Sequence, residues 1–436
     1  MSKSSMEKLG KQYWGTLLHA PVPFFLCLYA LSLMVSMSGM EIFGWGACIL
    51  TLVYILVNKA VKMREFYLFR LGVEVPLLGL LLVVWMSLTF NAPEAGLLEP
   101  IGKLRWILML YLLTFALEVS PVLNRILHIF IVAGTIVGGY AIFQHFTGVD
   151  IIRGDHRAVT PAPFEGADVF QNSGFLSHHL TYGYSFSMIL CFSFAALLLS
   201  RRKPWYVRLG FLSSVIIIGL SLVWTYGRGV WLATAIAFLI MTSYVSRKHL
   251  IVFLLIVGSL CGVVYETNPG LRERVASVWD AGYFSNDDRR AVWKANFEMF
   301  SDHPWMGVGY LQNEVLLGEY YKKLGIEKEF GGHAHNNYLQ MLSTTGILGF
   351  FCYMLFILSF LLMTHRLWTD VPETHFWHRV LVLGALGAQL SLHTGGITQW
   401  NFGDAENNHL FIFILAMMAY MSERYARGIV PDDYSL

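Results

Sequence analysis

Long apolar runs, separated by shorter polar segments, dominate the hydropathy pattern of this chain. A helix that crosses the hydrocarbon core of a membrane needs about 20 mostly apolar residues. Runs of roughly that length occur at about 21–39, 42–58, 72–90, 104–118, 126–145, 180–199, 209–225, 230–246, 250–266, 337–363, 380–394 and 408–421. The pattern predicts an all-α, polytopic integral membrane protein with about 12 transmembrane helices, in which residues 1–436 form a single membrane domain.

One connection, residues 267–336 between the ninth and tenth runs, is much longer than the others. Connections of this length in compact proteins are usually functional or disordered. Inside it, Trp293, Asn296, Phe297 and Phe300 follow the i, i+3, i+4, i+7 spacing of a helix face. We therefore expect one large outer loop that contains helices, including one over 287–300.

The basic residues predict an orientation, because short cytoplasmic loops carry an excess of Lys and Arg. Eighteen of the 31 fall on one set of loops, at Lys3, Lys8, Lys11, Lys59, Lys62, Arg64, Arg70, Arg125, Arg201, Arg202, Lys203, Arg208, Arg247, Lys248, Arg366, Arg379, Arg424 and Arg427. These loops are expected to face the cytoplasm, together with both termini. The first run is expected to be a retained span, since no small-residue cleavage site follows it.

Composition excludes several classes of protein. The chain is 56% apolar and 14% charged, with a mean hydropathy of +0.53, whereas soluble domains carry roughly 25% charged residues. A net charge of +2 without a dense basic block argues against a nucleic-acid partner and leaves membrane lipids as the expected surroundings. The five cysteines show no paired spacing, so neither a disulfide framework nor a zinc site is indicated.

The sharpest polar motif, Gly331-Gly332-His333-Ala334-His335-Asn336-Asn337, stands where the long outer loop re-enters the membrane. An imidazole there titrates near neutrality and could take a proton from an attacking hydroxyl, as a general base. Two alternatives stay open. The histidines and asparagines could simply cap the following helix, or His333 and His335 could bind a metal, although no further ligands stand nearby in the sequence.

A second motif, Thr225-Tyr226-Gly227-Arg228-Gly229-Val230-Trp231, places an arginine in a glycine-flanked hairpin on the outer side. Its planar guanidinium matches phosphate oxygens, and the glycines would let a bulky anionic group approach the backbone. The alternative is an arginine that extends to the membrane interface without a specific role.

The third motif, Arg289-Arg290-Ala291-Val292-Trp293, lies on the expected loop helix. Neighbouring positions on a helix are rotated by about 100°, so the two arginines cannot point the same way. One could face a polar cavity while the other meets solvent or Asp287; alternatively, both belong to a solvated charge cluster.

Taken together, these motifs describe a cationic pocket at the outer face with one titratable base, which suits a lipid-linked diphosphate. His333, Asn336, Arg105 and Arg157 are possible additional members of this site, and Arg105 is equally consistent with an ordinary interfacial residue. The same question stays open for Arg153, His178 and His179 in the outer loop 146–179. No metal ion or other cofactor is expected.

In their order along the chain, the motifs resemble the bacterial O-antigen ligase and polymerase superfamily. The residues that carry the resemblance are Gly227-Arg228-Gly229-Val230-Trp231-Leu232, Arg289 four positions before Trp293, His303-Pro304-Trp305-Met306-Gly307-Val308-Gly309, His335-Asn336-Asn337-Tyr338-Leu339, Gly346 and Gly349. The core of the resemblance runs from about 220 to 360.

The resemblance implies a metal-independent glycosyltransferase of the bacterial inner membrane, with its active site on the periplasmic face. In the ligase branch, such an enzyme transfers O-antigen from undecaprenyl diphosphate to a sugar hydroxyl of the lipid A core, completing lipopolysaccharide. His335 is similar to the family's essential histidine, Arg228 to its hairpin arginine and Arg289 to its loop arginine. The doubled Arg289-Arg290 leaves that last assignment open. A single displacement with inversion at the anomeric carbon is expected.

Two alternatives differ in acceptor or in class. An O-antigen polymerase or a protein O-oligosaccharyltransferase of the same superfamily would share the donor chemistry. A secondary transporter would also fit twelve spans, but transporters place ionisable groups near the membrane midplane. Here Glu74 and His393 are among the few ionisable residues in the predicted spans. The polar chemistry lies at the outer surface, which favours the enzyme.

Overall fold

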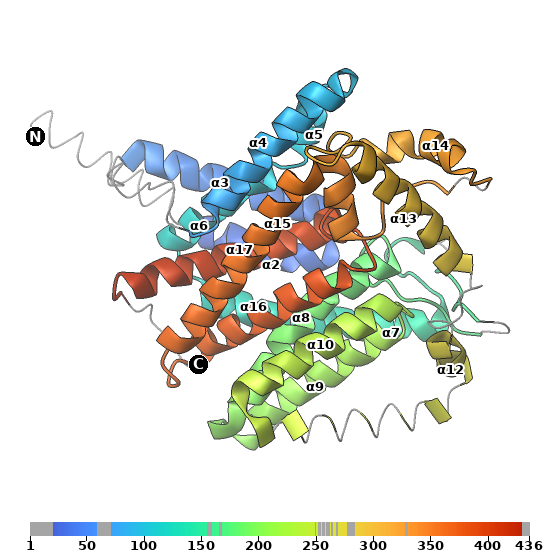
Figure 1. Ribbon diagram of the computed structural model, residues 1–436. Coiled ribbons are helices and arrows are strands. Elements are labelled where there is room, and N and C mark those ends of the chain that lie inside the picture. The colour runs from blue at the N-terminus through green and yellow to red at the C-terminus, as the bar shows by residue number, and fades with distance from the viewer. Residues whose placement is uncertain are drawn as a thin grey trace, which may run out of the picture.

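The computed structural model of the chain describes residues 21–58, 71–154, 159–164, 168–248, 250–251, 254, 258, 262, 265–266, 269–276, 284–327 and 330–429. Within these ranges the backbone is mainly helical, and its β-structure is a single isolated bridge between Pro161 and Phe170. Figure 1 shows the helices, which are α2 (Pro21–Val35), α3 (Met37–Asn58), α4 (Glu74–Asn91), α5 (Leu98–Gly102), α6 (Trp106–Val119), α7 (Leu123–Thr147), α8 (His179–Leu199), α9 (Trp205–Val223), α10 (Arg228–Val245), α12 (Pro269–Ala276), α13 (Phe284–Asp302), α14 (Asn313–Leu324), α15 (Asn337–Asp370), α16 (Phe376–Gly395) and α17 (Ala405–Ala426).

Among the described residues, seven helical segments are long and apolar enough to cross a membrane: α3, α4, α7, α8 with the short turn after it, α9, α10 and α15. Helices α2 and α6 are apolar but shorter. A spanning segment must satisfy its backbone hydrogen bonds internally, which a helix does. The prediction of an all-α, polytopic membrane protein is thus confirmed.

Every predicted span except the ninth overlaps one of the described helices. The ninth, 250–266, lies largely outside the described residues, so the total of about 12 spans stays a prediction. The predicted loop helix at 287–300 is confirmed as part of α13, and α12 and α14 are further helices in the same long loop.

The centre of the bundle is formed by α8, α16 and α17, whose side chains are mostly buried. Glycines let α8, α10 and α16 approach one another closely. A β-carbon on Gly384 would lie 2.4 Å from Cδ1 of Phe192, and one on Gly387 would lie 2.3 Å from Sδ of Met241. Small residues at helix crossings allow the backbones of neighbouring helices to approach closely.

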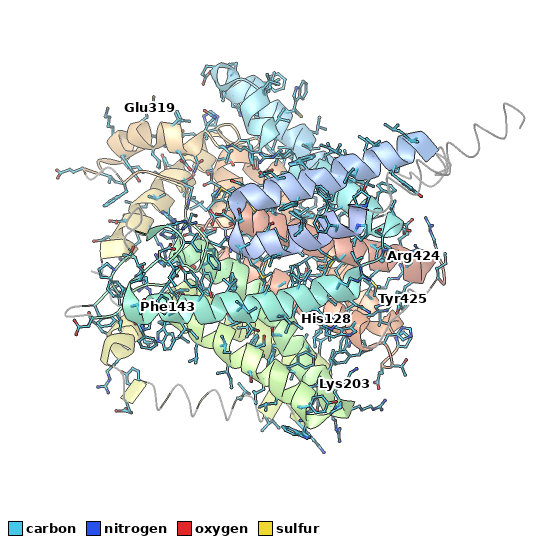
Figure 2. The ribbon with its side chains drawn as sticks, turned by 180° about the vertical axis from the view of Figure 1, so that it is seen from behind. His128, Phe143, Lys203, Glu319, Arg424 and Tyr425 are labelled. Carbon is cyan, nitrogen blue, oxygen red and sulfur yellow. The ribbon has the colours of Figure 1, made fainter. Side chains whose placement is uncertain are left out.

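The two ends of the bundle differ. Figure 2 shows Phe143 of α7 and Glu319 of α14 toward one end, and His128, Lys203, Arg424 and Tyr425 toward the other. We call the end that carries α13 and α14 the loop end. Helices α8, α10, α15 and α17 begin at this end (Figure 1).

Helix α15 is interrupted at Gly346, whose φ of 63° and ψ of −167° are not helical. The segment 304–308 from the long loop occupies this break. Its Val308 N–H donates to the carbonyl oxygen of Ser343 (2.9 Å), and a β-carbon on Gly346 would lie 2.3 Å from the carbonyl carbon of Trp305. The first part of α15 is therefore fixed to the long loop, and the histidine motif lies at its N-terminus.

Candidate active site

The histidine motif adopts a tight loop before α15. Gly332 has a φ of 108°, and His335 has a φ of 47°, in the left-handed region that residues other than glycine rarely occupy. The His335 N–H donates to Nδ1 of His333 (3.2 Å), and the two rings lie 4.3 Å apart between centroids. A histidine keeps this backbone conformation only when the surrounding structure stabilises it, so the contacts around the loop determine its shape.

Asn336 is the N-cap of α15. Its side-chain oxygen accepts from the N–H groups of Tyr338 and Leu339, both at 2.9 Å. Such a cap satisfies backbone donors that a helix leaves without an internal partner. The capping interpretation of the motif therefore holds for Asn336, while His335 points its ring elsewhere.

A buried amide network supports the loop from three helices. Trp293 of α13 donates from Nε1 to the carbonyl oxygen of Ala334 (2.9 Å), and the Ala334 N–H donates to Oε1 of Gln340 in α15 (2.8 Å). Gln340 in turn exchanges hydrogen bonds with Asn313 of α14, and Asn313 donates to Asn296 of α13 (2.8 Å). All three amides are fully buried, so the network fixes the loop before any substrate arrives.

His335 is held through one ring nitrogen. Its Nδ1 lies 3.0 Å from Oε1 of Gln399, which can only accept, so Nδ1 carries the hydrogen and Nε2 carries the lone pair. Burial lowers the pKa of His335; the Gln399 hydrogen bond raises it, and the Arg289 charge lowers it. The ring is therefore neutral at pH 7, with Nε2 able to accept a proton.

His333 is also neutral. Burial, the neighbouring His335 and the Arg289 charge together lower its pKa to about 4. Its Nδ1 accepts the His335 N–H, so it supports the backbone of His335. Within the described residues, no group of three or more His, Cys, Asp or Glu side chains is arranged to hold a metal ion.

The structure separates the two adjacent arginines. Arg290 is exposed and pairs with Asp287 at 2.7 Å, whereas Arg289 is partly buried. Arg289 is also close enough to lower the pKa of both His333 and His335. Of the pair, Arg289 is the one that acts on the histidine loop.

Arg228 is the first residue of α10, at the loop end. The next residue, Gly229, packs tightly: a β-carbon there would lie 2.3 Å from Oγ1 of Thr398 and 2.6 Å from the hydroxyl of Tyr184. Thr398 adjoins Gln399, the partner of His335. The 398–399 segment thus joins the start of α10 to the histidine loop, and a side chain at 229 would displace the Thr398 and Tyr184 hydroxyls.

The structure gives two of the other candidates their own partners and leaves the third undescribed. Arg105 pairs with Glu41, which also lies 3.5 Å from Nε2 of His409, in a cluster of α3, α6 and α17. Arg153 donates to the backbone carbonyls of Phe175 and Leu176. Arg157 falls outside the described residues.

Two titratable residues with shifted pKa values stand at the N-terminal ends of α8 and α17. His178, the N-cap of α8, has its pKa lowered by burial and by His335, so it lies near the histidine loop. Asp404 precedes α17, where burial and Glu406 raise its pKa to about 6, and it accepts from Thr181 (3.2 Å). Sequence reasoning left His178 open and missed Asp404.

Gln399 was also missed. It lies 64 positions from His335, and its only signal in the sequence is a polar run, Thr398-Gln399-Trp400-Asn401, between the last two apolar segments. Nothing in that run identifies a partner.

Comparison with known proteins gives one family. A search of curated proteins finds no match. Residues 212–354, which are 143 of the chain's 436 residues, match the family model described as O-antigen ligase. The matched segment contains Arg228, Arg289 and His335. This match supports the O-antigen ligase and polymerase superfamily for the chain.

Proposed function

We propose that the chain is an O-antigen ligase: a metal-independent glycosyltransferase that moves O-antigen from undecaprenyl diphosphate to a sugar hydroxyl of the lipid A core. The observation that carries the proposal is a neutral His335, oriented through Nδ1, beside the Arg289 cation at the loop end of a membrane helix bundle. We further propose that this end faces the periplasm of the inner membrane, with both termini in the cytoplasm.

The reaction would be a single displacement. The acceptor hydroxyl oxygen attacks the anomeric carbon, its proton moves to Nε2 of His335, and the bond from that carbon to the diphosphate oxygen breaks. The electron pair of the broken bond stays on the departing undecaprenyl diphosphate. Attack from the face opposite the leaving group inverts the anomeric configuration.

The arginines would stabilise the leaving group. Charge builds up on the diphosphate oxygens as the bond breaks, and a fixed guanidinium stabilises this charge without rearranging. We assign this role to Arg289 and Arg228. Arg290 is set aside because its partner is Asp287 at the surface.

The acceptor distinguishes the ligase from the other enzymes of this superfamily. A polymerase or a protein O-oligosaccharyltransferase could use the same donor chemistry, and the superfamily match is compatible with a ligase or a polymerase. We favour the ligase because one dominant loop, residues 267–336, carries the extramembrane helices near the site. Three parallel assays with one donor and a lipid A core, a second lipid-linked glycan or a pilin as acceptor separate these activities.

The decisive experiment uses purified protein in nanodiscs with a lipid-linked O-antigen donor and lipid A core. We expect His335→Ala to lower transfer by about 10²–10⁴-fold, the usual contribution of a general base. His365→Ala is the matched control, because this exposed histidine lies near the opposite end of α15 and contacts Tyr244. Full activity of His335→Ala would remove the base from the mechanism.

A further inference from the structure

We propose that Gln399 is a positioning residue that selects the Nε2-basic tautomer of His335 without adding negative charge beside the departing diphosphate. This inference rests on the proposed function, in which His335 is the general base. It adds a residue from the segment between α16 and α17, which lies outside the part of the chain that matches the family model.

The contact itself is specific. Gln399 is 7% exposed, and its side-chain oxygen faces Nδ1 of His335 at 3.0 Å. A carbonyl oxygen can only accept a hydrogen bond, so the contact is favourable only when Nδ1 is protonated. In a neutral imidazole this leaves the lone pair on Nε2, the nitrogen that would receive the acceptor proton.

A set of hydrogen bonds, which we call the clamp, keeps Gln399 next to His335. Asn337, two positions after His335, donates its N–H to the carbonyl oxygen of Gly396 (2.6 Å) and its side-chain amide to Oδ1 of Asn401 (2.7 Å). Asn401 also donates to the carbonyl oxygen of Leu392 (2.8 Å). Gly396 and Asn401 bracket Gln399, so the segment that carries it cannot move away from the histidine loop without breaking the clamp.

The choice of an amide has an electrostatic reason. Many general-base histidines are oriented by a carboxylate, which also stabilises the imidazolium. Here a carboxylate would place a negative charge close to the cation of Arg289 and to the diphosphate that this cation is proposed to hold. An amide orients the ring and leaves the positive field of Arg289 for the leaving group. In exchange, it raises the pKa of His335 less than an ionised partner would.

This reasoning gives opposite shifts for two substitutions. Gln399→Leu removes the acceptor, so the pKa of His335 falls and the acid limb of kcat/KM moves to lower pH, while kcat drops by about tenfold or more because the tautomer is no longer fixed. Gln399→Glu supplies an ionised acceptor, so the acid limb moves to higher pH, and KM for the donor rises because the new charge repels the diphosphate.

The test is a pH–rate series on the full-length protein in nanodiscs, with circular dichroism to check folding. Gln389→Leu is the matched control: this buried glutamine of α16 donates to Thr364, and its loss should leave the acid limb in place. An unchanged rate and acid limb for Gln399→Leu would overturn the inference, as would a rate loss in both Gln399 variants without any shift of the limb. His335→Ala keeps the two proposals distinct. If it is inactive while Gln399→Leu behaves as wild type, only the positioning role fails; if it is active, the general base itself fails.

Discussion

The break in α15 predicts that Gly346→Ala is strongly destabilising. The position has a φ of 63° and a ψ of −167°, and an added β-carbon would lie 2.3 Å from the carbonyl carbon of Trp305 and 2.4 Å from its oxygen. These are backbone atoms, so no side-chain rotation relieves the overlap. The segment 304–308 would have to leave the break.

The magnitude follows from what this movement removes. A residue other than glycine in such a conformation costs about 1–3 kcal/mol. Separation also removes the backbone hydrogen bonds from Val308 to Ser343 (2.9 Å) and from Ile347 to Pro304 (2.8 Å), each worth about 1 kcal/mol. The total of about 3–5 kcal/mol is a large part of the roughly 5–15 kcal/mol that stabilises a typical fold.

Thermal unfolding of the detergent-solubilised protein, followed by size-exclusion chromatography, measures the effect. We expect the apparent Tm to fall by about 5 °C or more. Gly139→Ala in α7 is the control, because a β-carbon there meets no neighbour within 4 Å and alanine has the better helix propensity. If Gly346→Ala unfolds at the same temperature as the wild type, segment 304–308 does not occupy the break in α15.

Two further predictions concern the charges of the site. Arg289→Ala should lower kcat by about a hundredfold, which corresponds to about 3 kcal/mol of transition-state stabilisation. Arg290→Ala should change kcat by no more than about twofold, because its exposed ion pair with Asp287 contributes little. Equal losses of kcat in steady-state assays of the two variants would refute this assignment. Because its lowered pKa keeps His335 neutral, the transfer rate should persist below pH 6.5 and decline only as His335 is protonated. The pH–rate profile of Asp404→Asn shows whether the Asp404 carboxyl, with its pKa of about 6, causes the decline instead.

Much of the fold could be predicted from hydrophobic runs alone, because membrane spans and amphipathic helices have local periodic signals. The predicted helix at 287–300 lies within α13, and the histidine motif lies at the start of α15, as a polar cluster before an apolar run indicates. The break at Gly346 could not be predicted in this way. It depends on a backbone segment some 40 positions earlier in the chain, and a glycine in an apolar run has no pattern that distinguishes a break from close packing.

The candidate site was only partly readable for the same reason. Helical rotation showed that Arg289 and Arg290 must diverge, but their different surroundings, with the histidine loop near one and Asp287 against the other, come from tertiary packing. Arg105 has a positive charge at the predicted outer end of a span, but the structure pairs it with Glu41 of α3. Gln399 had no local signal, since its significance lies entirely in the ring nitrogen that it faces.

The coupling between Arg289 and His335 has a consequence for the order of events at the site. Burial, with a smaller contribution from the Arg289 cation, lowers the pKa of His335 and keeps its ring neutral. When a diphosphate binds against that cation, its negative charge offsets the same field, so the pKa of His335 must rise on donor binding. His335 would therefore be a stronger proton acceptor in the donor complex, where the proton is transferred.

The acid limb of kcat, which reports the donor-bound protein, should then lie at higher pH than the acid limb of kcat/KM measured against the donor. Because Arg289 is proposed to hold the diphosphate close to the ring, Arg289→Ala should reduce this shift. An undiminished shift would show that Arg289 does not position the diphosphate beside His335.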